Sequence, residues 1–135
     1  MGPHTILNPE SLAPAVGYAH AVVAAPGRLV FLGGQAAVDA SGEVRGETLV
    51  EQFDLALANV VEALAAAGGR PEHVVSMQIY VTDAAAYRGA LRELGERYRA
   101  RLGRHYPAMA LLEVTGLFDP ALQVEIVCTA VVPGG

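Results

Sequence analysis

Only a few side chains of this 135-residue sequence are of types that carry out acid–base or nucleophilic chemistry. Glu125 stands between Val124 and Ile126, and a carboxylate held among apolar neighbours can serve as a general acid or base. His20 and His105 can titrate near neutral pH, but scattered histidines are more often surface or turn residues. Glu125 is therefore the candidate acid or base, although one carboxylate is not a complete catalytic constellation.

Cysteine and metal chemistry have little support in the sequence. The single cysteine, Cys128, excludes a disulfide framework, and no cysteine–histidine spacing typical of a zinc site occurs. Cys128 shares one face of an expected strand with Ile126 and Ala130, so we expect a small buried hydrophobic residue there. A nucleophilic thiol would need an adjacent base, and none is evident. We predict no metal site.

The composition is that of one packed domain over residues 1–135. Hydrophobic residues make up 53% of the chain and charged residues 17%, with a net charge of −5. This acidic balance argues against binding of DNA or RNA, which requires clustered basic residues. No apolar run approaches the ~20 residues of a membrane span, and no signal peptide is visible, so we expect a cytoplasmic protein.

Hydrophobic periodicity predicts the elements that position these residues, in the order β-β-α-β-α-β-β. The clearest is a helix over residues 48–67, where Thr48 and Glu51 have the spacing of a capping box. Residues 74–81 alternate with a period of two, as in a strand with one buried face. The other elements are an extended N-terminal arm (1–16), strands 18–24 and 28–33 joined by a turn at 25–27, a second helix capped by Asp83, and strands 108–114 and 122–132.

The two expected helices cross between strands, and right-handed crossovers place them on the same side of one sheet. The opposite face of the sheet is then uncovered, although its residues are largely apolar. A small domain also has difficulty burying so high an apolar fraction by itself. We therefore expect the chain to associate through its sheet.

A series of motifs in the last third of the chain resembles the signature of the Rid/YjgF family. From Tyr106 to Ile126 the sequence has Pro-Ala, then Glu-Val, a Leu-x-x-Pro turn and Val-Glu-Ile. Upstream matches are Tyr18, Leu29 to Gln35, Gly42 to Val44, Ala66 to Gly69, and Val74 to Asp83. The resemblance covers about residues 18–132 and is specific for the fold, whereas the activities of the family are mixed.

The resemblance implies an α+β fold of the chorismate-mutase-like (YjgF) type, with both helices on one face of a mixed sheet and a homotrimer built around a central barrel. Small-molecule sites are then expected in the clefts between subunits. The best-known members hydrolyse 2-imino acids or their enamine tautomers to 2-oxo acids and ammonia. They use no metal or organic cofactor, so we expect none here. The expected partners are a small molecule and further copies of the chain, with no nucleic acid and no membrane.

Several positions depart from the pattern of the deaminating members. These have Pro-Ala-Arg, whose guanidinium forks onto the substrate carboxylate, whereas this chain has Met109 in place of the arginine. Gly33 stands where a small serine is common. The asparagine early in the second helix corresponds to either Leu91 or Arg92. Arg92 either replaces the missing anion-binding group or is an ordinary solvated helix residue.

The resemblance thus yields a candidate site with Glu125 as the catalytic residue, positioning water or shuttling a proton. The predicted substrate-binding residues are Tyr18, Gly33, Leu91, Arg92, Met109 and Leu111. If the protein is an enzyme, we expect cofactor-free hydrolysis (deamination) or tautomerisation of an imine, enamine or related carbonyl compound other than the standard 2-imino acid. The alternative is a non-catalytic homotrimer that binds a hydrophobic metabolite or a protein partner.

Overall fold

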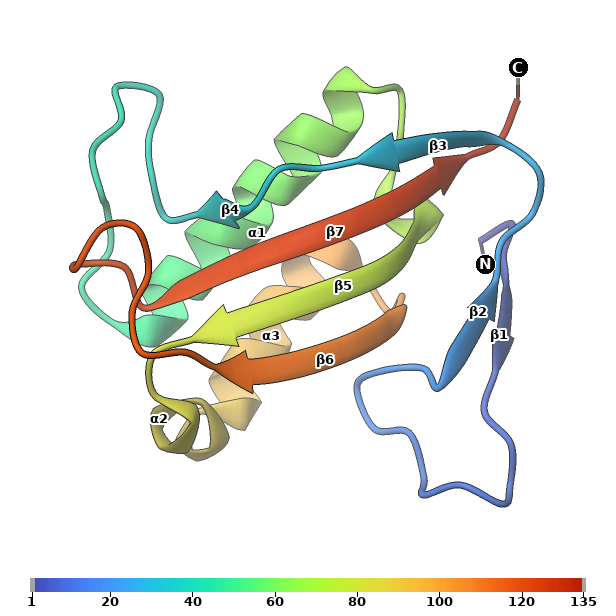
Figure 1. Cartoon of the computed structure of the whole chain (residues 1–135), viewed down its shortest axis with the longest axis horizontal. Helices are drawn as coiled ribbons and strands as arrows, with labels where there is room; N and C mark the ends of the chain where they lie inside the picture. The colour runs from blue at the N-terminus through green and yellow to red at the C-terminus, as the bar shows by residue number, and fades with distance from the viewer. Residues whose placement is uncertain (1, 135) are drawn as a thin grey trace.

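A mixed β-sheet with helices packed on one face forms the body of the molecule (Figure 1). The computed structural model describes residues 2–134. Its elements are β1 (Thr5–Leu7), β2 (Ala21–Val23), β3 (Arg28–Phe31), β4 (Gln35–Ala36), α1 (Leu49–Ala66), a 3₁₀ turn (Pro71–His73), β5 (Val74–Val81), α2 (Ala84–Gly89), α3 (Leu91–Leu102), β6 (Ala108–Glu113) and β7 (Val124–Val132). None of the helices in residues 2–134 is long and apolar enough to cross a membrane.

Helix α1 forms as its sequence predicts. The Thr48 side chain accepts a hydrogen bond from the Glu51 backbone, and the Glu51 side chain accepts one from the Thr48 backbone, which completes the capping box. Phe53, Leu57 and Val60 then lie on one face of the helix and are almost completely buried against the sheet. This packing, together with the cap, fixes α1 behind the sheet.

The second expected helix is two helices in the structure. Asp83 caps α2 as predicted, since its side chain accepts a hydrogen bond from the Ala86 backbone N–H at 3.0 Å. The backbone leaves the helical conformation at Ala90 (φ −121°, ψ 17°), directly after Gly89, so α3 starts as a separate helix at Leu91. The break changes the direction of the chain just before the residues that reach the candidate site.

The sheet has the strand order β3-β7-β5-β6, with β4 also paired to β7. Strands β5 and β6 are parallel, while β7 runs antiparallel to β5, β3 and β4. Met77 on β5 and Ile126 and Cys128 on β7 face α1 and α3 and are almost fully buried in the core. The expected arrangement, with helices on one face of a mixed sheet, is confirmed.

The predicted hairpin between strands 18–24 and 28–33 is wrong. Strand β2 pairs with β1, which lies inside the expected extended arm, and β3 pairs with β7 instead. The 25–27 segment passes close over the end of β7. A Cβ at Gly27 would collide with the carbonyl oxygen of Val132, so only glycine allows this close approach. A long central strand such as β7 offers β3 more cross-strand contacts than the short β2 does.

The β1–β2 pair is attached to the main sheet through His4. The Ala25 backbone N–H donates to Nδ1 of His4 at 3.0 Å, so the other ring nitrogen, Nε2, carries the hydrogen. Nε2 lies 3.0 Å from the carbonyl oxygen of Val131 and donates to it. These two hydrogen bonds fix the β1–β2 sheet to the end of β7. The segment between β1 and β2, which contains Tyr18, is thus anchored at both ends.

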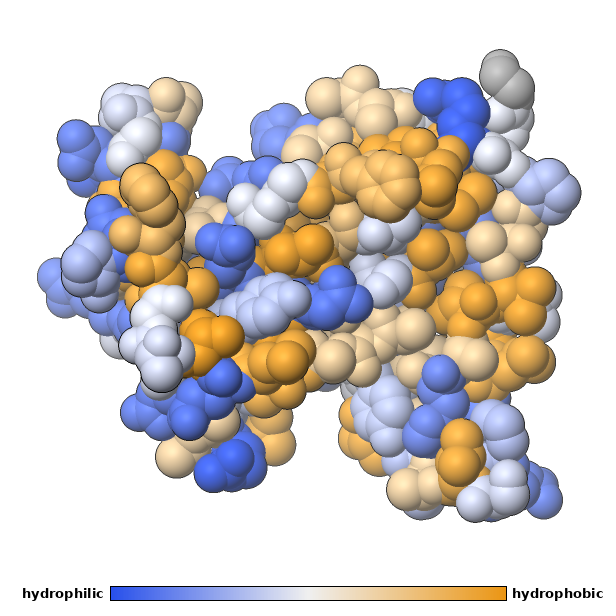
Figure 2. Space-filling view, in the orientation of Figure 1, coloured by the Kyte–Doolittle hydropathy of each residue, from blue (hydrophilic) through white to orange (hydrophobic). Residues whose placement is uncertain are grey.

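The face of the sheet opposite the helices is open in the single chain, as expected. Leu29 and Phe31 on β3 are 58% and 74% exposed and point outward beside Val131 and Thr129 of β7. Figure 2 views this face and shows apolar side chains gathered over the β3–β7 side. We call this surface the open face.

Candidate functional site

A cavity of about 540 Å³ lies on the helix side of the sheet, between the edge strand β6, helix α3 and the segment that ends at Tyr18. Its volume is in the range of small-molecule sites in proteins. The lining residues are mainly apolar or aromatic: Val16, Gly17, Tyr18, Phe53, Ile79, Tyr87, Leu91, Leu94, Gly95, Tyr98, Arg99, Tyr106, Met109, Ala110 and Leu111.

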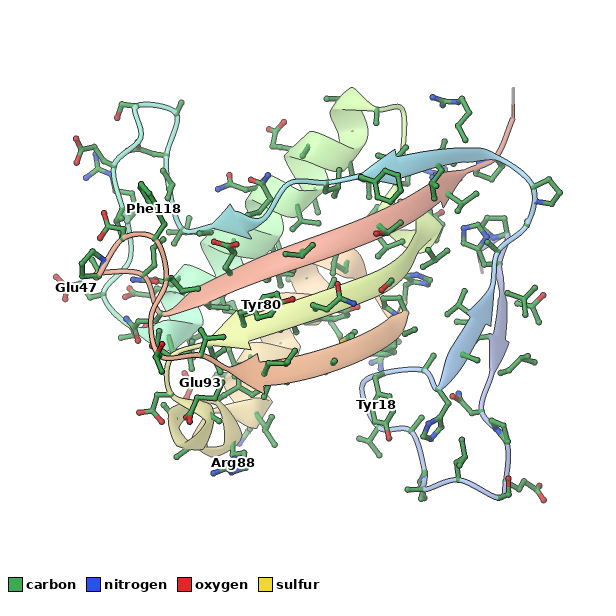
Figure 3. The ribbon with its side chains drawn as sticks, in the orientation of Figure 1. Tyr18, Glu47, Tyr80, Arg88, Glu93 and Phe118 are labelled. Carbon is green, nitrogen blue, oxygen red and sulfur yellow. The ribbon has the colours of Figure 1, made fainter. Side chains whose placement is uncertain are left out.

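Tyr18 reaches the cavity because the chain beside it attaches to the edge of β6. The Ala19 backbone N–H donates to the carbonyl oxygen of Pro107 at 3.0 Å, and Ala19 and Ala108 form a parallel bridge. Gly17 turns the chain into this position with a φ of 76°, which glycine adopts without strain. Figure 3 shows Tyr18 on its loop beyond the end of the sheet.

Tyrosine rings form the inner wall of the cavity. Tyr98 and Tyr106 stack with ring centroids 5.2 Å apart, and the Tyr98 hydroxyl donates to the carbonyl oxygen of His105 at 2.5 Å. Tyr87 packs edge-on against Phe53 at 6.1 Å. Burial raises the pKa of Tyr98 far above its ordinary value and also raises the pKa of Tyr87. Tyr87 and Tyr98 are therefore neutral at physiological pH.

Met109 contributes its side chain to the floor of the cavity. It is the register partner of Met77 on the parallel strand β5, and both side chains face the helices. Leu111 follows two residues later on the same side, and Leu91 stands at the start of α3. The structure thus brings Tyr18, Leu91, Met109 and Leu111 of the predicted binding residues to one cavity.

Arg92 does not reach this cavity. Its side chain is 93% exposed and lies 3.6 Å from Glu96, one turn further along α3. Of the two residues that could correspond to the family's helix asparagine, the structure therefore places Leu91 at the cavity and Arg92 in solvent.

Glu125 lies on the other side of the sheet. Its neighbours Val124 and Ile126 are fully buried toward the helices, so the half-buried Glu125 side chain points to the open face. Its register partner there is Tyr80, which Figure 3 labels in the middle of the open face. The predicted catalytic residue and the Met109 cavity are consequently separated by the sheet in one chain.

The backbone of Gly34 lies against Glu125. A Cβ at Gly34 would collide with the Glu125 carboxylate, whereas a Cβ at Gly33 would have no atom within 4 Å. Gly33, a predicted binding residue, is absent from the lining of the cavity. Glycine at 34 is what allows the carboxylate to lie against the backbone.

The remaining candidate groups serve the structure. Cys128 is 1% exposed, and burial raises the pKa of its thiol to about 12, which confirms the expected buried hydrophobic residue. Nε2 of His105 lies 2.7 Å from the carbonyl oxygen of Val74, and that of His20 lies 2.7 Å from the carbonyl oxygen of Ala13. Within residues 2–134, no three His, Cys, Asp or Glu side chains gather in a way that could hold a metal ion.

Sequence patterns did not point to Arg99, the charged residue of the cavity lining. It follows Tyr98 in a helix with several arginines, where an ordinary solvated residue is the usual interpretation. The signal that could have found it is Gly95, a helix-breaking residue one turn before it on the same side.

Comparison with known proteins agrees with this architecture. The family model described as "Endoribonuclease L-PSP" matches residues 8–132. The chain belongs to the Rid/YjgF family. No curated protein sequence matches it significantly.

Solved structures of this family superpose over nearly the whole chain. YyfB of Yersinia pestis, from the conserved Rid family, is 32% identical and has a TM-score of 0.86, with 96% of this chain and 98% of that chain covered. Rv2704 of Mycobacterium tuberculosis is 34% identical with a TM-score of 0.64, covering 96% and 99%. RidA from an Antarctic Psychrobacter is 28% identical with a TM-score of 0.68, covering 95% and 98%. Membership in the Rid/YjgF family supports a role in acting on or binding small molecules.

Proposed function

We propose that this chain is a cytoplasmic Rid-family enzyme that hydrolyses or tautomerises an imine, an enamine or a related carbonyl compound, without a cofactor, in clefts between the subunits of a homotrimer. The observation that carries the proposal is the separation of Glu125 from the Met109 cavity by the sheet. A site that uses both needs the open face of one copy beside the cavity of another. The exposed apolar residues on the β3 side of the open face, Leu29 and Phe31, provide a surface for that association.

In the proposed hydrolysis, Glu125 positions a water molecule and takes one of its protons while the water oxygen attacks the imine carbon. The carbon becomes tetrahedral and carries a hydroxyl and an amino group. The proton that Glu125 took goes to the imine nitrogen as this amino group forms. The hydroxyl proton then moves through Glu125 to the amino nitrogen, and ammonia leaves as the carbonyl forms. In tautomerisation the same carboxylate moves a proton between carbon and nitrogen, with no net uptake of water.

Met109 excludes the standard 2-imino acid as the preferred substrate. A thioether cannot pair with a carboxylate, and burying an unpaired carboxylate against it would cost several kcal/mol. The cavity floor instead favours an apolar group. The substrate either lacks a carboxylate beside the imine carbon or holds it on another residue.

The test is imine hydrolysis in competition with semicarbazide, with an amino-acid oxidase generating 2-imino acids in the assay. We expect slow hydrolysis by the wild type and a gain in Met109→Arg, because the scaffold is competent and only the substrate has changed. Rapid hydrolysis of 2-imino acids by the wild type would contradict the proposal that Met109 excludes substrates with a 2-carboxylate.

Glu125→Gln tests the catalytic role on an imine that lacks a 2-carboxylate. Loss of a general base lowers turnover by about 100- to 10,000-fold, while ligand binding is retained. Unchanged turnover in Glu125→Gln would remove Glu125 from the mechanism.

The alternative is a non-catalytic trimer that binds a hydrophobic metabolite. The largely apolar lining of the cavity favours this alternative, because it contains no Asp, Glu, His, Cys or Lys that could act as a general acid or base. Binding of apolar ligands without turnover of any imine, in the wild type and in Glu125→Gln alike, would establish it. An endoribonuclease role fits poorly with the net charge of −5.

A further inference from the structure

The cavity contains one charged side chain among its lining residues, that of Arg99. Every other described residue of the lining is apolar, aromatic or glycine. Arg99 is exposed to solvent at the edge of this apolar cavity, where its guanidinium can pair with an anionic group of a ligand. Arg99 is therefore the group that decides the charge of a ligand in this cavity.

The arginines of α3 differ in their partners. Three of the four form ion pairs within the chain: Arg92 with Glu96 at 3.6 Å, Arg97 with Asp54 at 3.1 Å, and Arg101 with Asp54 at 3.0 Å. Arg99 has no carboxylate partner among residues 2–134, and it is the one of the four that lines the cavity. Its guanidinium is thus free to bind an anion that enters from outside the chain.

Gly95 makes room for this guanidinium. A Cβ at position 95 would lie 3.0 Å from Nη1 of Arg99, closer than nearly all real contacts of a Cβ. The Arg99 side chain therefore folds back over the preceding turn of α3, in the direction that helical side chains favour. Glycine in the middle of a helix is unfavourable relative to alanine, so its presence here is explained by the space it leaves.

We propose that Arg99 binds the carboxylate of an amphipathic organic acid whose hydrocarbon or aromatic body fills the cavity between Met109 and the tyrosine wall. The proposal rests on the proposed function in that it names the substrate class of the same cavity. A guanidinium pairs with a carboxylate through two parallel hydrogen bonds, which a neutral ligand cannot form. The acid group is thus held by α3, while β6 contacts the apolar body.

Binding of 3-phenylpropanoate and of its neutral amide, measured by isothermal titration calorimetry, tests this assignment. The two probes have nearly the same shape and differ in charge. We expect the wild type to bind the carboxylate at least about tenfold more tightly than the amide, as for a hydrogen-bonded charge pair. The preference decreases as salt is raised, because the pair is partly exposed.

Arg99→Leu should reduce the preference to less than about twofold while the amide still binds. Arg88→Leu is the matched control: it removes the same charge from an exposed arginine on α2 that is not part of the lining, and it should keep the preference. Figure 3 shows Arg88 well away from Tyr18.

Gly95→Ala tests whether glycine at this position serves ligand binding by Arg99 or only the packing of α3. The added methyl group makes the end of the Arg99 side chain shift by a few tenths of an ångström, so we expect a small decrease in the preference for the carboxylate, while the helix becomes more stable and the midpoint of thermal unfolding rises. A merely structural glycine would leave binding unchanged.

Equal affinity for both probes, failure of the wild type to bind the carboxylate, or an unchanged preference in Arg99→Leu would overturn the assignment. These outcomes concern binding alone. Failure of the proposed reaction would instead appear as absent imine turnover with the carboxylate preference intact, so the two proposals fail separately.

Discussion

The Met109 cavity and the surface around Glu125 lie on opposite sides of the same sheet and are built differently. The cavity has walls of large apolar and aromatic side chains from several elements. On the Glu125 surface, the backbone of Gly34 lies directly against the carboxylate, and Tyr80 is the neighbouring residue on β5. In the proposed function, the cavity selects the shape of a ligand and Glu125 supplies the reactive group. The comparison teaches that neither region is a complete site in one chain.

Disrupting the open face should have the largest effect on imine turnover, because it should separate the two regions that the proposed site combines. Phe31→Asp places a charge on an exposed apolar residue that we expect to be desolvated between copies, at a cost of several kcal/mol. The assembly should fall to single chains, and imine turnover should disappear. Size-exclusion chromatography with light scattering measures the mass. Ala85→Asp on α2, on the helix side, is the control and should leave it unchanged.

Gly34→Ala should have the next largest effect, confined to the Glu125 side. The methyl group pushes the carboxylate out of position, and displacement of a catalytic group by about 1 Å lowers kcat/KM by up to about 100-fold. Ligand binding in the cavity should change little. Gly33→Ala adds the same methyl group where no atom lies within 4 Å and should be close to wild type. Equal losses in both variants would count against this account of Gly34.

Tyr98→Phe sharpens the description of the cavity wall. It removes the hydroxyl that donates to the carbonyl oxygen of His105 but keeps the stacked ring. We expect a loss of about 1 kcal/mol in the free energy of unfolding, measured with urea. Tyr106→Phe keeps the same stack without removing a described hydrogen bond and should be nearly neutral. The opposite ranking would show that the Tyr98 hydrogen bond contributes little.

We expect a smaller effect of pH on the free energy of unfolding. The residue responsible, His73, lies in neither the cavity nor the Glu125 surface. Burial lowers the pKa of His73, the last residue of the 3₁₀ turn before β5, below its ordinary value. The unfolded chain then binds more protons than the folded chain as pH falls below about 6.5, so stability is full above that pH and decreases toward acid. Unfolding in urea at pH 7.5 and 5.5 measures this loss, which His73→Gln should reduce. An equal loss of stability at pH 5.5 in the wild type and in His73→Gln would show that other titratable groups cause the pH dependence.

Local elements could be predicted well from the sequence, because their signals lie within a few residues. The capping box of Thr48 and Glu51 and the cap at Asp83 form as expected, and the alternation over 74–81 matches β5. The burial of Cys128 also follows from its place in a strand of alternating residues. The break at Ala90 escaped prediction, because the apolar stripe continues across it.

The site could be predicted only in part. Tyr18, Leu91, Met109 and Leu111 come together from distant segments, which the family resemblance anticipated and periodicity alone did not. Arg92 and Arg99 are chemically identical and lie on one helix. Their difference depends on the rotation of α3 against the sheet and on the space at Gly95, neither of which is visible in the residue types.

By itself the sequence determined the elements, their caps, the apolar character of both sheet faces and membership in the family. Tertiary structure decided which strands pair, so that β3 joins β7 and β2 joins β1. It also decided that Glu125 and Met109 face opposite sides, and that Arg99 is the arginine at the cavity. The physical reason is that caps and periodicity act over a few residues, whereas strand partners and side-chain directions depend on packing between distant segments.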